Sequence, residues 1–184
     1  MKNMEKYFLA ILPSEEIFNR AEQIKNELKE KFNVKYALKS PAHITVKMPF
    51  PFDENREAQL IEKLGSFLKS YPCFDLRIAG IHHFGNRVIY SKVAESEALR
   101  TLQEDLRKFC RLHLHLVEEL SDRNYTPHMT LAFKDIKPKI YDQIFEFVNK
   151  QPIEGAFSVH QICLLKKVEG RWKVIFHLDL QCKS

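Results

Sequence analysis

The chain has 184 residues, of which 45% are apolar and 29% are charged, and its formal net charge is +5. This composition excludes an intrinsically disordered chain, and the length allows one large domain or two small lobes that share an interface. The modest positive charge favours anionic partners without requiring a nucleic-acid polymer.

The N-terminal apolar run at 6–12 ends at Pro13 and is too short for the apolar core and cleavage site of a signal peptide. No other stretch approaches the roughly 18 apolar residues that a membrane-spanning helix needs. We therefore expect a cytoplasmic protein without a membrane partner, and we expect a monomer.

Hydrophobic periodicity predicts the same series of elements in both halves of the chain. In the first half the series is a strand at 6–12, a helix at 17–32 with apolar residues every three or four positions, a short strand around Ile44, a helix at 60–68 and a strand at 73–81. In the second half it is a strand at 87–93, a helix at 99–109, a short strand around Met129, a helix at 140–147 and a strand at 155–165. A final strand at 171–180 is expected to pair with the preceding one through a turn at 168–170.

The order of elements therefore forms an internal repeat with halves at about 1–86 and 87–184. Ser14 and Ser96 open the first helix of each half and are 82 positions apart, and His43 and His128 are 85 positions apart. A duplicated unit of this kind predicts an α+β fold with two lobes about a pseudo-two-fold axis, each an antiparallel-rich sheet with outer helices, around a central cleft. Because no Pro-, Gly- or Ser-rich linker separates the halves, residues 1–184 are expected to form one fused bilobal domain.

Each half carries a histidine, an apolar residue and a threonine in its short strand, "HIT" at 43–45 and "HMT" at 128–130. Side chains two positions apart in a strand point to the same face, roughly 6.6 Å apart, so His43 projects with Thr45 and His128 with Thr130. If the two strands meet across the cleft, two imidazoles and two hydroxyls surround one small space. One H-x-T triplet arises easily by chance, but two copies at equivalent places in a repeat favour a functional site.

These four side chains suit a tetrahedral phosphate. Each threonine hydroxyl can donate to a non-bridging oxygen while the imidazoles lie on either side of the phosphorus. Because histidine titrates near neutral pH, one imidazole can take a proton from the nucleophile and the other can protonate the leaving oxygen, each worth typically about 10² to 10⁴-fold in rate. The scheme requires no metal and no other cofactor, and it leaves open which histidine is the base.

Other candidate substrate contacts lie close to the two motifs. If the strands keep their alternation, Lys47 shares a face with Thr45, and Lys134 shares one with Thr130. Arg123, in the loop before the second motif, could meet a flanking phosphate. All three are alternatively ordinary solvated residues. Three aromatic residues could stack on a nucleobase, or could instead be core or lid residues: Tyr36, Phe84 and Tyr125.

Other histidines and the cysteines raise the alternative of a metal hydrolase. His113 and His115 have the i, i+2 spacing that a metal site can use, and His82 and His83 are adjacent. No carboxylate or cysteine cluster accompanies them at ligand spacing, so surface or helix-end positions are expected. The four cysteines form neither a C-x-x-C pair nor a dense disulfide framework, and we expect them to be small buried apolar side chains: Cys73, Cys110, Cys163 and Cys182.

With these motifs the chain resembles the 2H phosphoesterase superfamily, in its 2′-5′ RNA ligase-like and RNA 2′,3′-cyclic phosphodiesterase branch. The resemblance rests on "YFLAILPSEE", "PAHITVKMPF", "FGNRVIYSKV" and "YTPHMTLAF", which span nearly the whole chain. It implies metal-free chemistry at cyclic or 2′-linked phosphodiesters, with His43 and His128 as the acid and base and with Thr45 and Thr130 holding the phosphate. The chain departs from the cyclic phosphodiesterases at Phe133, where these often have an arginine.

The sequence thus predicts a hydrolase, a phosphoesterase that acts on a cyclic or 2′-type phosphodiester of a nucleotide or RNA end. Opening of a 2′,3′-cyclic phosphate to a 2′-phosphate is the reaction that the resemblance favours. The alternative is a catalytically silent RNA- or nucleotide-binding module of the same fold.

Overall fold

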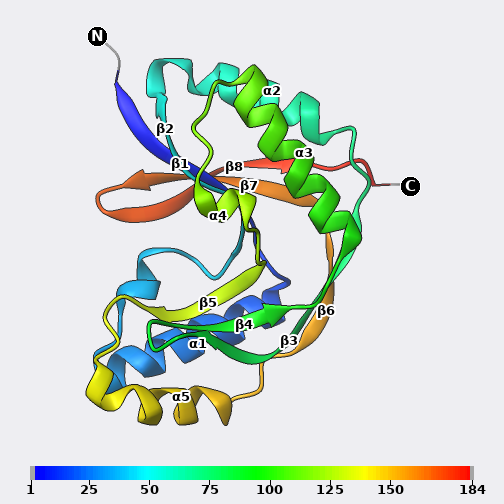
Figure 1. Cartoon of the computed structure of the whole chain (residues 1–184). Coiled ribbons are helices and arrows are strands. Elements are labelled where there is room, and N and C mark those ends of the chain that lie inside the picture. The colour runs from blue at the N-terminus through cyan, green and yellow to red at the C-terminus, as the bar shows by residue number, and fades with distance from the viewer. Residues whose placement is uncertain (1–2, 183–184) are drawn as a thin grey trace.

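The computed structural model describes residues 3–182 (Figure 1). The strands are β1 (Met4–Ile11), β2 (Ile44–Asp53), β3 (Phe74–Phe84), β4 (Val88–Val93), β5 (His128–Phe133), β6 (Gly155–Val159), β7 (Gln161–Val168) and β8 (Arg171–Asp179). The α-helices are α1 (Glu15–Phe32), α2 (Glu57–Leu68), α3 (Glu97–His113), α4 (Leu120–Arg123) and α5 (Tyr141–Asn149). Short 3₁₀ helices lie at Tyr36–Lys39, Glu54–Arg56 and Pro138–Ile140.

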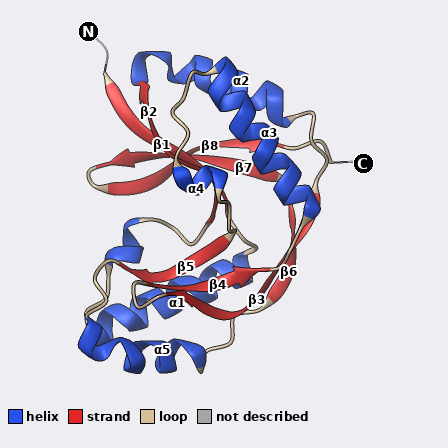
Figure 2. Cartoon of the chain, in the orientation of Figure 1, coloured by secondary structure: helices blue, strands red, loops and turns tan. Residues whose placement is uncertain are grey.

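The strands form one antiparallel sheet in the order β6-β3-β4-β5-β2-β1-β7-β8. Between β5 and β2 the pairing is reduced to Ile44 opposite Met129. The sheet therefore divides there into a first lobe, β2-β1-β7-β8, and a second lobe, β5-β4-β3-β6, which Figure 2 shows as separate groups of strands. The predicted α+β fold with two antiparallel lobes is confirmed, and the lobes are continuous through this one pair.

Helices cover the outer face of each lobe (Figure 1). In the first lobe α2 packs against β8 and α3 against β2, and in the second α1 packs against β5 and α5 against β3. The lobes therefore do not coincide with the halves of the sequence. Helix α1 follows β1 of the first lobe but covers the second, and α3 makes the converse crossing. Each lobe is therefore built from elements of both the earlier and the later part of the described chain.

The local patterns explain the elements. In α1 the buried apolar residues fall three or four positions apart and form one stripe: Ile17, Ala21, Ile24 and Leu28. Ser96 caps α3, because its side chain accepts a hydrogen bond from the Leu99 amide at 3.2 Å. The turn between β7 and β8 uses Glu169 and Gly170 with φ of 50° and 78°, the left-handed pair of a two-residue hairpin, which confirms the predicted turn.

The end of the chain differs from the sequence prediction in two ways. The strand expected at 155–165 is two strands, because β6 pairs with β3 in the second lobe and β7 pairs with β1 and β8 in the first. Cys110 and Cys163 are buried as predicted, but Cys73 and Cys182 form a disulfide. They meet because the chain after β8 returns beside Pro72, which bridges Gln181. None of the described helices has the length and apolar character needed to span a membrane.

Candidate active site

The two H-x-T segments meet at the junction of the lobes. Ile44 and Met129, the middle residues, lie opposite each other and are fully buried. Because the strands are antiparallel, extending this register by one residue each way sets His43 across from Thr130 and Thr45 across from His128. These four side chains are half-buried, on the face opposite to the buried apolar residues. The structure thus brings the two motifs together at this pair of the sheet.

Both imidazoles are held in the same way. His43 Nδ1 lies 2.7 Å from the carbonyl oxygen of Pro41, and His128 Nδ1 lies 2.7 Å from that of Thr126, in each case two residues earlier. A carbonyl can only accept, so Nδ1 carries the proton and Nε2 is left to take or give one. Main-chain carbonyls therefore orient each imidazole and fix its tautomer, a role that a carboxylate side chain often has beside a histidine.

Burial lowers the pKa of both imidazoles. For His43 the pKa falls to about 4, first because of burial and further because of the positive charges of Lys25 and His128, while the bond to Pro41 opposes the shift. Burial also lowers the pKa of His128, against the bond to Thr126. Each histidine therefore favours its neutral form in the free protein, and an anionic ligand would raise both pKa values.

Aromatic rings pack on each imidazole. The Phe8 ring lies 4.9 Å from that of His43, and the Tyr90 ring lies 5.1 Å from that of His128, centroid to centroid. Phe8 and Tyr90 were not identified from the sequence. They lie on β1 and β4. The offset of 82 positions that relates Ser14 to Ser96 also relates Phe8 to Tyr90, so comparison of the two halves of the sequence could have identified this aromatic pair.

Beyond these rings lies a second aromatic residue on each side. Trp172 meets Phe8 edge to face at 4.7 Å. On the other side Phe84 stacks on Tyr90 at 4.3 Å and meets His128 edge to face at 5.2 Å. The side chain of Phe84 is 39% exposed, which leaves much of this ring open to a ligand. Trp172 was not identified from the sequence.

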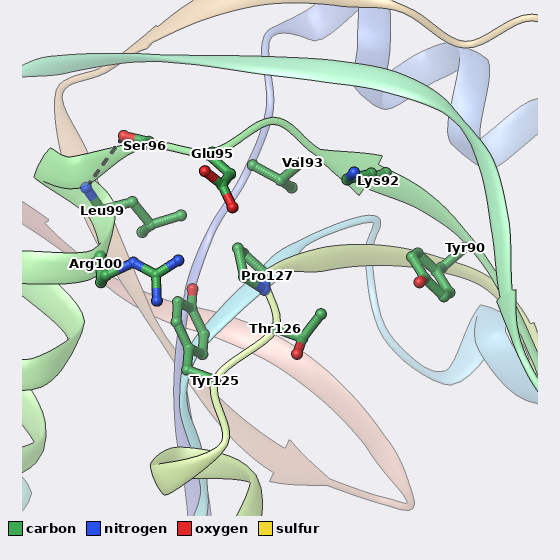
Figure 3. A pocket seen from close by; sticks show the side chains of 10 residues that line it. All are labelled: Tyr90, Lys92, Val93, Glu95, Ser96, Leu99, Arg100, Tyr125, Thr126 and Pro127. Carbon is green, nitrogen blue, oxygen red and sulfur yellow. Dashed lines mark hydrogen bonds between the residues drawn. The ribbon is translucent and has the colours of Figure 1, made fainter.

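Tyr125 lines two hollows beside the junction. One, of about 250 Å³, is lined by Thr45, Phe84, Tyr125 and His128 among others. The other, of about 230 Å³, is lined by Tyr125 and Arg100 among others, and Figure 3 shows these two side chains facing each other. The Tyr125 hydroxyl donates to the main-chain carbonyl of Thr45 at 2.9 Å. Tyr125 thus forms a wall of the site and ties the second motif's loop to β2.

Lys47 does not lie where the alternation placed it. Thr45 is opposite Ala10 and Lys47 is opposite Leu9, so β2 has an extra residue here, and such a bulge shifts the side chains that follow to the other face. Lys47 is 1% exposed, and its Nζ lies 2.6 Å from Oδ2 of Asp122. The prediction of Lys47 as a substrate contact is therefore wrong: its ammonium group is enclosed in an ion pair.

A matching bulge follows the second motif. Thr130 lies opposite Tyr90 and Ala132 opposite Ile89, so β5 also gains a residue, and Ala132 is fully buried. Lys134 follows the strand in a left-handed conformation with φ of 68°. It does not continue the face of Thr130 as the alternation suggested.

Lys134 and Tyr36 instead form a cationic and aromatic patch at the end of β5. Lys134 Nζ lies 3.1 Å from the Tyr36 hydroxyl, and Lys134 and Lys39 each lie 4.6 Å from the centroid of the Tyr36 ring. The bond to Lys134 lowers the pKa of Tyr36. Arg123 is exposed and bonds Glu118 at 2.8 Å, beside a hollow that also touches Tyr125.

The loop before His43 is held by an ion pair between a buried lysine and a half-buried glutamate, neither of which was identified from the sequence. Lys25, 2% exposed, donates to Glu22 Oε1 at 2.6 Å and to the Ser40 carbonyl at 2.8 Å. The same Glu22 oxygen accepts the Ala42 amide at 2.7 Å. Lys25 lies on the buried, mostly apolar face of α1, and a lysine at such a position indicates a buried charge that needs a partner.

The histidines that suggested a metal hydrolase do not gather. In the described part of the chain, the side chains that could jointly hold a metal ion are Cys73, His160 and Cys182. This group does not include His82, His83, His113 or His115. It also contains no residue of the two H-x-T segments.

The chain is similar to known proteins over nearly its whole length. The model of the 2′-5′ RNA ligase superfamily matches residues 13–171. The chain is 27% identical over 172 residues to a provisionally named phosphoesterase of Geobacillus sp. strain WCH70, covering 92% of each. It is 26% identical over 160 residues to an RNA 2′,3′-cyclic phosphodiesterase of Thermotoga maritima, covering 84% of this chain and 83% of that one. The fold matches E. coli LigT with a TM-score of 0.65 at 17% identity, covering 97% of this chain and 98% of LigT. A structure of LigT in complex with 3′-AMP matches with a TM-score of 0.63 at 17% identity, covering 97% of this chain and 99% of that one.

Proposed function

Because the chain belongs to the 2′-5′ RNA ligase superfamily, we propose that it is a phosphoesterase that hydrolyses a cyclic or 2′-linked phosphodiester of a nucleotide or RNA end. The observation that carries the proposal is the convergence of both H-x-T segments on one pair of the sheet, with each imidazole held through Nδ1. The cyclic phosphodiesterase of T. maritima and the LigT complex with 3′-AMP support a nucleotide substrate.

For a 2′,3′-cyclic phosphate the reaction uses the four motif side chains. Water attacks phosphorus while Nε2 of one histidine takes its proton, and Nε2 of the other gives a proton to the 3′ oxygen as the P–O3′ bond breaks. The products are a 2′-phosphomonoester and a free 3′-hydroxyl. The hydroxyls of Thr45 and Thr130 donate to the two non-bridging oxygens, where negative charge builds up in the transition state.

The electrostatics of the site suit one histidine that acts as base and one that acts as acid. The reaction needs one neutral and one protonated imidazole at the same time. Both pKa values are lowered in the free protein, so the base form is ready, and the negative phosphate favours protonation of the second imidazole when substrate binds. Binding of the substrate itself therefore prepares the acid.

The aromatic rings beside the histidines provide places for a nucleobase. Phe84 is the most open of them, and stacking on such a ring is worth roughly 1 to 3 kcal/mol per base. In this proposal Phe84 stacks on the base next to the phosphate and Tyr125 shapes the hollow. Lys134, Tyr36 and Arg123 contact phosphates and bases farther along an RNA strand.

The proposal is tested by measuring turnover and affinity separately on an oligonucleotide with a 2′,3′-cyclic phosphate end. For His43→Ala and for His128→Ala, we expect the rate to fall by about 10² to 10⁴-fold while the dissociation constant stays within a few-fold. His113→Ala, at the end of α3, is the matched control and should keep the wild-type rate. Wild-type binding without turnover would indicate the silent binding module, and turnover that survives both substitutions would refute the proposed roles.

A further inference from the structure

A second group of reactive side chains lies outside the proposed active site. Cys73 precedes β3, His160 joins β6 to β7, and Cys182 follows β8. One ligand atom from each lies within 4.8 Å of the others. The two sulfurs form the disulfide, and Nδ1 of His160 lies 3.2 Å from Sγ of Cys182.

Main-chain hydrogen bonds hold the three segments together independently of the disulfide. The Leu180 amide donates to the His160 carbonyl at 2.8 Å, and the Gln181 amide donates to the Tyr71 carbonyl at 2.8 Å. The Cys73 amide donates to the Gln181 carbonyl at 3.4 Å. The three side chains therefore stay neighbours when the sulfurs are reduced.

We propose that the reduced form of this group binds one Zn²⁺ ion through Cys73, Cys182 and His160. Two thiolates and an imidazole are a ligand set that zinc prefers, and at the usual bond lengths the ligand atoms of a tetrahedral site lie roughly 3.5 to 3.8 Å apart. The imidazole nitrogen is already near that distance from one sulfur, so the main change is separation of the two sulfurs. His160 and Cys182 are exposed, which leaves an entry path and a fourth position for water.

The disulfide and the zinc site are mutually exclusive states. Opening the disulfide takes two electrons and two protons from a dithiol reductant, which is itself oxidised to a disulfide. Zinc then replaces the two thiol protons and takes the neutral imidazole as its third ligand. In either state the segment after β8 stays fastened to the start of β3.

The test uses the full chain after treatment with a dithiol and removal of excess reductant. We expect one equivalent of Zn²⁺ per chain by competition with a chromogenic chelator, and Co²⁺ in its place should give thiolate-to-cobalt charge-transfer absorption. Reoxidation should release the metal. Cys73→Ser and Cys182→Ser should abolish stoichiometric binding, and His160→Ala, which keeps both cysteines, should weaken it at least about tenfold.

His177→Ala is the matched control, because the Nδ1 of His177 also lies close to a cysteine, 3.4 Å from Cys163 Sγ. It should bind metal as the wild type does. Reduced wild type that binds no more metal than the Cys73→Ser variant, or His160→Ala that binds as tightly as wild type, would show a plain disulfide and overturn the proposal. The readout is metal binding, so it is independent of the proposed phosphoesterase activity.

Discussion

The ion pair between Lys47 and Asp122 should be among the most sensitive contacts near the site. The two side chains are 2% and 1% exposed and 2.6 Å apart, and the pair joins β2, the strand of the first motif, to α4, which precedes the second motif. Asp122→Asn removes the negative charge that neutralises the buried ammonium, whose other oxygen contacts are long, to the carbonyls of Met48 at 3.3 Å and Val117 at 3.4 Å. Removing one partner of a buried pair typically costs about 3 to 5 kcal/mol, and we expect that loss in the free energy of unfolding.

Lys47→Met should cost less, because the Asp122 carboxylate keeps hydrogen bonds from the amides of Met48 at 2.9 Å and Glu119 at 3.0 Å. The assay is urea unfolding followed by fluorescence of the single tryptophan, with unchanged slopes showing that the same transition is measured.

The control is a pair with the same separation and opposite exposure. Lys150 and Glu146 are also 2.6 Å apart but 72% and 68% exposed, and Glu146→Gln should cost far less stability than Asp122→Asn, because water solvates both charges. A loss below about 1 kcal/mol for Asp122→Asn would contradict this expectation, since the buried pair would then behave like an exposed one.

Three further predictions follow from the site. Because the pKa of His43 is about 4 in the folded protein and about 6.5 in the unfolded chain, the unfolded chain binds the proton first, so stability should fall between pH 6.5 and 4 by up to about 3 kcal/mol. Urea titrations of wild type and His43→Gln across this range measure this loss. An equal dependence of the free energy of unfolding on pH in the two proteins would contradict the prediction. Tyr125→Phe removes the bond to the Thr45 carbonyl and should cost about 0.5 to 1.5 kcal/mol in urea unfolding, whereas no loss would mean that the bond does not tie the loop to β2. Phe84→Ala should weaken oligonucleotide binding by about 1 to 3 kcal/mol in a fluorescence titration, and unchanged affinity would remove Phe84 as the stacking platform.

Local pattern was enough to predict most of the elements in their order, apart from α4 and the division of 155–165 into β6 and β7, and to predict the shared face of each H-x-T pair. Helix and strand periodicity depend on which residues are buried nearby, and the buried Ile44 and Met129 fix the outward direction of the histidines and threonines. The crossing of α1 and α3 between lobes was not predictable, because an apolar stripe does not specify which sheet will cover it.

The bulges explain why the candidate contacts were less predictable than the motifs. Period-two counting from Thr45 assumes a strand without a bulge. One extra residue in β2 turns the Lys47 side chain toward the core, where it forms an ion pair with Asp122. The pairing of Cys73 with Cys182 likewise depends on the C-terminal segment returning beside Pro72, which no local spacing encodes.

Phosphorus NMR of the wild-type protein acting on an oligonucleotide with a 2′,3′-cyclic phosphate end, in excess EDTA, decides whether the chain is a metal-independent two-histidine phosphoesterase. Two-histidine hydrolysis predicts that the cyclic phosphate signal is replaced by that of a 2′-phosphomonoester, and that chelation leaves the rate unchanged. A 3′-phosphate product would contradict the assigned leaving oxygen, and loss of turnover in EDTA would contradict the metal-independent mechanism.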